Sequence, residues 1–179
     1  GRGCLAGPVV AASVVMTKNS ALDQNSQNLF DQINDSKLLS ATKRQELSTW
    51  IKNNSAWAIA EITPQIIDEI NILQASLLAM QKSVEMLHAK LENTKIENSI
   101  LLIDGKFKLP NYKYPQEAII KGDSKVVAIA AASIIAKVYR DDLMTELDKQ
   151  YPNYGLSVHK GYPTKQHREA IKLHGITTI

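Results

Sequence analysis

The chain has 179 residues, of which 44% are hydrophobic and 22% charged, so it suits one domain with a substantial core. Its formal charge of +3 is compatible with a polyanionic partner but is too small to demonstrate one. The single cysteine excludes an internal disulfide and favours a cytoplasmic protein, and the longest apolar run is too short to cross a membrane as a helix, which takes about 20 residues.

Predicted strands and helices alternate along the chain. Continuous or alternating apolar runs predict strands, whereas apolar positions three and four residues apart predict helices. In chain order we expect a strand over residues 8–16, a loop with at most one helical turn over 20–34, a helix over 40–53, a strand over 56–62, a helix from 63, strands over 99–103 and 118–120, a helix over 127–150, a loop over 151–163 and a helix over 164–173. Such alternation is typical of the α/β class.

Two of the predicted helices carry clear local signals. Ser40 is a predicted N-cap, and its helix should bury Leu47, Trp50 and Ile51. Apolar residues at 73, 77, 80, 84, 87 and 91 form one stripe, typical of a helix packed on a sheet. A coiled coil is the alternative, but the stripe ends after about three heptads.

Two aspartates occupy positions that suit a metal site. Asp104 follows the predicted buried strand 99–103, and Gly105 allows the backbone to turn there. Asp123 lies just before the alanine-rich helix. Carboxylates that converge at strand ends bind hard cations such as Mg²⁺, and two such ions can clamp the oxygens of a phosphodiester. Taken alone, the pair is better explained by the preference of Asp for turns and caps.

Seven short motifs stand in order along the chain. They are residues 1–8 (GRGCLAGP), 34–40 (NDSKLLS), 68–75 (DEINILQA), 103–105 (IDG), 122–125 (GDSK), 131–138 (AASIIAKV) and 159–164 (HKGYPT). In this order they resemble type 2 ribonuclease H, the bacterial ribonuclease HII family, from the first residue to about Gly175. The resemblance implies a ribonuclease H-like mixed sheet flanked by helices, in a single domain over 1–179 with a substrate-binding helical portion at about 151–179.

The resemblance also implies an activity. The family members are endonucleases that use Mg²⁺ or Mn²⁺ to hydrolyse the RNA strand of RNA–DNA hybrids and to cleave 5′ to single ribonucleotides in duplex DNA. They leave 3′-hydroxyl and 5′-phosphate ends and serve DNA replication and repair, and we expect a monomer. The alternative from another class is a non-catalytic nucleic-acid-binding module with the same fold. A small nucleotide-binding enzyme is a third reading, which the missing phosphate loop disfavours.

The family pattern uses four carboxylates, and two of them match Asp104 and Asp123. The other two form an Asp-Glu pair directly upstream of the Gly-Arg-Gly motif and would precede Gly1. We therefore expect residues 1–179 alone to be N-terminally incomplete and catalytically inactive. The same upstream segment should supply a strand that pairs with residues 8–16, so its loss would expose a sheet edge.

The resemblance assigns the recognition of ribose to two places. Gly1-Arg2-Gly3 would bring backbone groups to the 2′-hydroxyl, which separates RNA from DNA. Tyr162 would stack on a sugar or base beside it. The alternative for Tyr162 is a side chain packed at a loop–helix junction.

Two further residues are candidates for contact with the substrate backbone. Lys37 matches a family lysine that approaches phosphate, although its turn also suits local hydrogen bonding alone. Leu38 stands where a second lysine is usual, so the affinity for the backbone should be lower. Asn71 either touches phosphate or only adjusts a helix junction.

Overall fold

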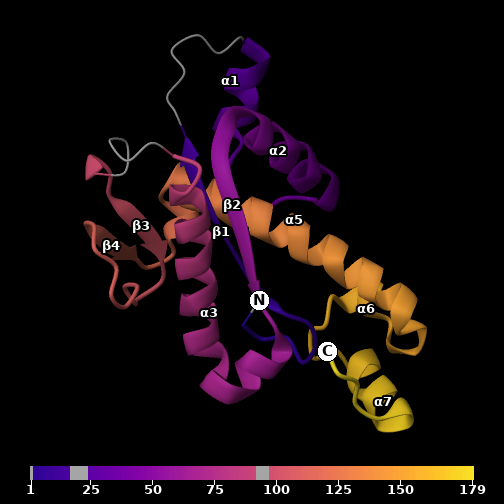
Figure 1. Ribbon diagram of the computed structural model, residues 1–179. Helices are drawn as coiled ribbons and strands as arrows, with labels where there is room; N and C mark the ends of the chain where they lie inside the picture. Colours follow the sequence, from indigo (N-terminus) through magenta and orange to yellow (C-terminus); the bar gives the residue numbers. More distant parts are fainter. Residues whose placement is uncertain (1, 17–23, 92–96) are drawn as a thin grey trace.

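The computed structural model describes residues 2–16, 24–91 and 97–179, and it confirms the alternation of strands and helices. Its elements are β1 (Val9–Met16), α1 (Gln24–Asp31), α2 (Ala41–Asn54), β2 (Ser55–Ile62), α3 (Pro64–His88), β3 (Leu101–Asp104), β4 (Gln116–Ile119), η1 (Gly122–Ser124), α5 (Val127–Gln150), η2 (Pro152–Tyr154), α6 (Leu156–His159) and α7 (Lys165–His174). Figure 1 shows β1 and β2 in the middle of the molecule, between α3 on one side and α2 and α5 on the other.

Strands β1 and β2 form an antiparallel pair over their full length, from Val9 opposite Ile62 to Met16 opposite Ser55. Because successive side chains point to opposite faces, each face of the pair meets a different helix. Val9 packs with Ala75 and Ala79 of α3 on one face. Helices therefore cover both faces of β1, which explains its nearly continuous apolar sequence.

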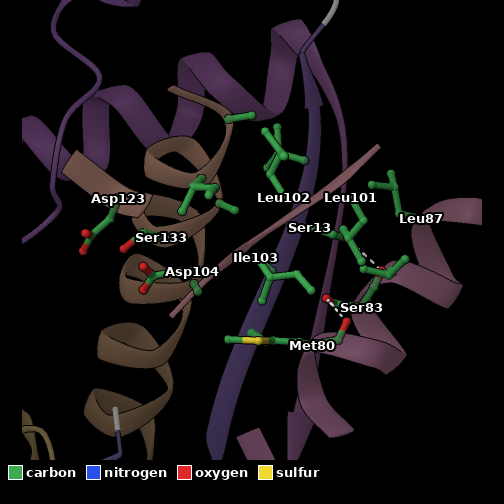
Figure 2. A pocket seen from close by; sticks show the side chains of 18 of the residues that line it. Ser13, Met80, Ser83, Leu87, Leu101, Leu102, Ile103, Asp104, Asp123 and Ser133 are labelled. Carbon is green, nitrogen blue, oxygen red and sulfur yellow. Dashed lines mark hydrogen bonds between the residues drawn. The ribbon is translucent and has the colours of Figure 1, made fainter. Parts of the chain in front are cut away.

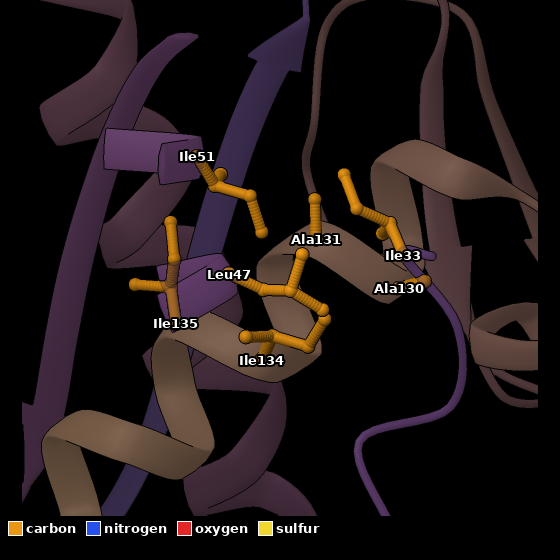
Figure 3. Close-up of a cluster of buried hydrophobic side chains, with 7 residues drawn as sticks. All are labelled: Ile33, Leu47, Ile51, Ala130, Ala131, Ile134 and Ile135. Carbon is orange, nitrogen blue, oxygen red and sulfur yellow. The ribbon is translucent and has the colours of Figure 1, made fainter. Parts of the chain in front are cut away.

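A cluster of seven buried side chains fills the other face, between β1–β2, α2 and α5 (Figure 3). Its members are Ile33, Leu47, Ile51, Ala130, Ala131, Ile134 and Ile135. The predicted inward face of α2 is thus confirmed, with Trp50 at the edge of the cluster, where its ring meets Phe30 edge to face. Ser40 accepts a hydrogen bond from the Lys43 N–H at 3.2 Å and caps α2 as predicted.

Truncation of this cluster should cost stability. Leu47→Ala is expected to lower the free energy of unfolding by about 2–5 kcal/mol, because Leu47 is fully buried and its removal leaves a cavity. Urea denaturation monitored by circular dichroism measures the change. Leu38→Ala is the matched control, since Leu38 is exposed and should shift stability by no more than about 0.5 kcal/mol. Equal losses in both variants would contradict the assignment of the core.

Two of the predicted loops contain helices. Helix α1 lies within the predicted loop 20–34, of which residues 20–23 lie outside the described part, and Leu29 and Phe30 pack against the core. This tertiary packing overrides the low helix propensity of an Asn- and Gln-rich segment. Likewise, η2 and α6 lie within the predicted loop 151–163.

Strands β3 and β4 pair in parallel, with Leu101 opposite Gln116 and Asp104 opposite Ile119. Among the described residues, no strand pairing joins them to β1 and β2. The expected mixed sheet therefore consists of one antiparallel and one parallel pair. Helix α3 packs against both pairs: Ala75 and Ala79 cluster with Val9 and Ile62 of the first pair, and Leu77 and Val84 cluster with Ile103 of the second.

The C-terminal elements gather at the far end of α5, as Figure 1 shows. Thr164 accepts a hydrogen bond from the His167 N–H at 3.2 Å, which caps α7 at the predicted start of the last helix. Within the described ranges, no helix has the length and apolar character needed to span a membrane.

Candidate active site

A cavity of about 910 Å³ separates the two strand pairs and is lined by the edges of β1 and β3 and by α3 and α5. Most of its wall is apolar. Figure 2 shows Asp104, Asp123 and Ser133 together at one end, whereas Leu101, Leu102 and Met80 lie away from them. We call the end with the two aspartates the acidic end. Strand β2 pairs with one edge of β1, and residues 9–15 of β1 line this cavity.

Asp104 is the last residue of β3, so its carboxylate leaves the strand where the sequence predicted. Its Oδ1 accepts a hydrogen bond from the Gly122 N–H at 2.9 Å, which joins the end of β3 to η1. A Cβ at position 122 would lie 2.6 Å from Cδ1 of Ile129, so a larger residue there would force the Ile129 side chain to move. The hydrogen bond fixes the orientation of the Asp104 carboxylate.

Asp123 in η1 is the buried member of the pair, with 7% of its surface exposed. Its Oδ2 lies 3.1 Å from Nζ of Lys37, whose side chain is 77% exposed. The hydrogen bond to Asp123 raises the pKa of Lys37, and the negative charges of Asp123, Asp35 and Asp104 add to this effect against the opposing effect of burial. The structure thus brings Asp104, Asp123 and Lys37 into one electrostatic environment.

The oxygen atoms at the acidic end suit a hard divalent cation. Two carboxylates stand beside the hydroxyl groups of Ser36 and Ser133, whose oxygens are 3.0 Å apart and whose residues line the same cavity. In the part of the chain that the structure describes, no group of three or more His, Cys, Asp or Glu side chains is arranged to hold a metal. The donors present therefore fit Mg²⁺ or Mn²⁺ in type and leave most coordination positions to water or to other groups.

Two of the proposed ribose-recognition residues line the same cavity. Gly1 lies outside the described residues, but Arg2 and Tyr162 both line the cavity that holds Asp104 and Asp123. Gly3 has open space around it, since a Cβ there would meet no atom within 4 Å. Its backbone is therefore accessible to a ligand.

Tyr162 is partly buried, with 37% of its surface exposed. Burial raises the pKa of its hydroxyl, and the neighbouring Cys4 thiol raises it further. Nζ of Lys137 lies 5.8 Å from the centre of the Tyr162 ring and 2.7 Å from Oδ1 of Asp141. The Tyr162 side chain is therefore partly packed against the protein and partly exposed. This is compatible with stacking on a sugar or base and with packing at a loop–helix junction.

Asn71 does not line this cavity and instead marks a kink in α3. Its backbone has a positive φ of 66°, and its Oδ1 accepts hydrogen bonds from the N–H groups of Leu73 and Gln74 at 3.0 and 3.1 Å. These contacts cap the second half of the helix and match the junction role. Contact of Asn71 with phosphate stays a prediction.

Three buried basic side chains lie near Tyr162: Arg140, His159 and His167. Arg140 of α5 donates hydrogen bonds to three backbone carbonyls, and the rings of His159 and His167 stack with centroids 4.2 Å apart. The motif at residues 159–164 contains His159 but not His167, and only the fold shows that the two rings stack. An arginine inside an alanine-rich helix was the one available signal for Arg140.

The histidine stack predicts sensitivity to acid. Burial lowers the pKa of His167 below its ordinary value of 6.5, and the nearby His159 lowers it further. The hydrogen bond to the Tyr162 carbonyl raises the pKa but does not offset this decrease. The stability that depends on neutral His167 is therefore present above about pH 6.5 and is lost as the pH falls towards the lower folded-state pKa. Melting temperatures between pH 7.5 and 5 should fall less steeply for His167→Gln than for the unaltered protein. Parallel pH profiles would show that His167 does not titrate in this way.

Comparisons with known proteins show the family of the chain. The family model described as Ribonuclease HII matches residues 1–178. The ribonuclease HII of Borrelia duttonii (strain Ly) is 49% identical over 180 aligned positions, which cover all of this chain and 91% of that protein.

Two solved structures resemble this fold. One is the PCNA:RNase HII complex from Archaeoglobus fulgidus, with a TM-score of 0.71 and 24% identity over 99% of this chain and 88% of that one. The other is Bst-RNase HIII in complex with Mn²⁺, with a TM-score of 0.71 and 18% identity over 98% of this chain and 60% of that one. At these identities the two likenesses show the fold alone.

The fold is that of the ribonuclease H class. The match over residues 1–178 and the identity to a curated relative make the assignment more specific. The chain belongs to the ribonuclease HII family, and it is a ribonuclease H.

Proposed function

We propose that this protein uses Mg²⁺ or Mn²⁺, held by Asp104 and Asp123, to hydrolyse the RNA strand of RNA–DNA hybrids and to cleave 5′ to single ribonucleotides in duplex DNA. The products carry 3′-hydroxyl and 5′-phosphate ends. One observation supports this proposal above the others: Asp104 and Asp123 line the same cavity as Arg2 and Tyr162. With this substrate the protein would remove ribonucleotides during DNA replication and repair. We propose further that it acts in the cytoplasm as a monomer.

The acidic end provides charge and orientation for this reaction. A divalent cation bound there supplies an electrophilic centre that neutralises charge on the scissile phosphate. The Gly122 N–H holds the carboxylate of Asp104 in place, and burial holds that of Asp123. The ammonium group of Lys37 is anchored to Asp123 yet largely exposed, so it can also meet a phosphate oxygen of the substrate.

Selectivity for RNA would arise at the residues proposed to recognise ribose. Backbone groups at Gly3 are open to the 2′-hydroxyl, and the exposed face of Tyr162 offers a surface for stacking on the adjacent sugar or base. Because Arg2 and Tyr162 share a cavity with the acidic end, a ribonucleotide bound beside them would face the same cavity as the two carboxylates.

The direct test is an end-resolved cleavage assay of a protein extended upstream of Gly1 by the Asp-Glu pair that the family pattern predicts, called the full-length protein below. Substrates are a duplex with one ribonucleotide, a long RNA–DNA hybrid and an all-DNA duplex, each with Mg²⁺, Mn²⁺ or EDTA. We expect metal-dependent cleavage 5′ to the ribonucleotide and none of the all-DNA duplex. Binding of the hybrid without cleavage would instead favour the non-catalytic nucleic-acid-binding module.

A further inference from the structure

Arg140 is a buried cation that contacts carbonyl groups rather than a carboxylate. Only 4% of its surface is exposed, and it belongs to no ion pair among the described residues. Its Nε donates to the Pro8 carbonyl at 3.0 Å, Nη2 to Ala6 at 3.0 Å and Nη1 to Lys160 at 2.8 Å. A buried guanidinium is costly unless its donors are used, so this arrangement is specific.

The three carbonyls belong to two loops that are far apart in the sequence. Ala6 and Pro8 lie in the N-terminal loop, residues 2–8, whereas Lys160 lies in the C-terminal loop, residues 160–164. The loops also meet directly, through a hydrogen bond from the Leu5 N–H to the Gly161 carbonyl at 2.8 Å. Gly161 has a positive φ of 81°, and a Cβ there would clash with the Ala6 carbonyl oxygen.

Each loop carries one half of the proposed ribose-recognition site. The N-terminal loop contains Arg2 and Gly3, and the C-terminal loop contains Tyr162. The distance between the two halves therefore depends on contacts that converge on Arg140. Arg2, Tyr162 and Arg140 itself all line the cavity of the acidic end.

We propose that Arg140 is a positioning residue that sets Tyr162 against the Arg2–Gly3 backbone and thereby determines the preference for a single embedded ribonucleotide. The inference rests on the proposed function. A duplex with one ribose offers a single productive register, so the two loops must hold that ribose in the correct place. A long hybrid offers many riboses, and a displaced loop can still find one of them.

The contact requires an arginine. Three carbonyls in different directions match the donors of a guanidinium, which are spread over three nitrogens, whereas the three N–H donors of lysine share one nitrogen. Arg140→Lys keeps the charge but cannot reach all three carbonyls. The loops should then shift relative to each other without the loss of a cation.

The test compares kcat/KM for the single-ribonucleotide duplex with that for the long hybrid, in the full-length protein with the Asp-Glu pair. Arg140→Lys should lower the ratio at least about tenfold and spread the cleavage positions around the ribonucleotide. Arg44→Lys is the matched control, because Arg44 of α2 donates from Nη1 to the Ser36 and Leu39 carbonyls beside Lys37. Arg44→Lys should change kcat/KM by the same factor for both substrates and leave their ratio unchanged.

A second variant keeps the proposal testable if Arg140→Lys folds poorly. Gly161→Ala pushes the two loops apart with Arg140 intact and should lower the same ratio. In the double variant with Tyr162→Ala, Arg140→Lys should add little further loss, because both changes act on one contact.

The outcomes separate this inference from the proposed function. If the unaltered protein cleaves neither substrate, the proposed function fails. If the unaltered protein prefers the duplex with one ribonucleotide, and Arg140→Lys and Gly161→Ala both leave the ratio of the two kcat/KM values unchanged, only the positioning role of Arg140 is overturned.

Discussion

Asp104→Asn is expected to lower metal-dependent cleavage by at least about 1,000-fold in a full-length protein that carries the upstream acidic pair. Asparagine keeps the size of the side chain but removes the negative charge, and charge stabilisation by a bound cation is worth several kcal/mol, at about 1.4 kcal/mol per tenfold in rate. Binding of the hybrid should survive, because Asp104 would hold the metal rather than the nucleic acid. Single-turnover cleavage and fluorescence anisotropy measure the two effects.

The control is a carboxylate outside the cavity. Asp142 of α5 is exposed, does not line the cavity and lies beside the Lys137–Asp141 ion pair. Asp142→Asn should cleave at nearly the rate of the unaltered protein. Near-normal cleavage by Asp104→Asn would remove Asp104 from the mechanism, and comparable losses in both variants would point to a general effect of charge.

Tyr162→Ala is expected to reduce cleavage at a single embedded ribonucleotide by roughly 5–150-fold, which corresponds to the loss of a stacking contact worth about 1–3 kcal/mol. The melting temperature should change little, because one face of the ring is exposed and its removal leaves most of the packing intact. Cleavage rates and thermal unfolding of the same preparation give the comparison.

Another tyrosine of the C-terminal portion provides the control. Tyr151 packs edge to face against Tyr154 and does not line the cavity. Tyr151→Ala should affect stability without changing the preference between substrates. If Tyr162→Ala behaves in the same way, with matched losses of melting temperature and activity, the packing alternative for Tyr162 is correct.

The local signals in the sequence predicted most of the elements. Ser40 caps the helix that it was expected to cap, Thr164 caps α7 at the predicted start of the last helix, and α5 covers residues 127–150 as predicted. Each of these boundaries depends on hydrogen bonds or apolar spacing within one turn, so the sequence alone carries the information. Helix α1 was missed because contacts of Leu29 and Phe30 with distant elements stabilise it.

Part of the candidate site was also predictable from local sequence signals. Asp104 and Asp123 were found because each lies at the end of a recognisable element, and their approach follows from the bond between Asp104 and Gly122. The pairing of Lys37 with Asp123 was not predicted, since it joins residues 86 positions apart. Arg140 was assigned no role, because its partners lie in two loops that only the tertiary structure brings together.

Anomalous diffraction from full-length crystals soaked in Mn²⁺ tests the central claim most directly, namely that Asp104 and Asp123 together bind the catalytic cation. The account predicts an anomalous peak within roughly 2.0–2.5 Å of a carboxylate oxygen of each aspartate, with Lys37 displaced from Asp123. The peak should be absent in Asp104→Asn crystals soaked in the same way. A Mn²⁺ site elsewhere, with the Lys37–Asp123 ion pair intact, would contradict the assignment.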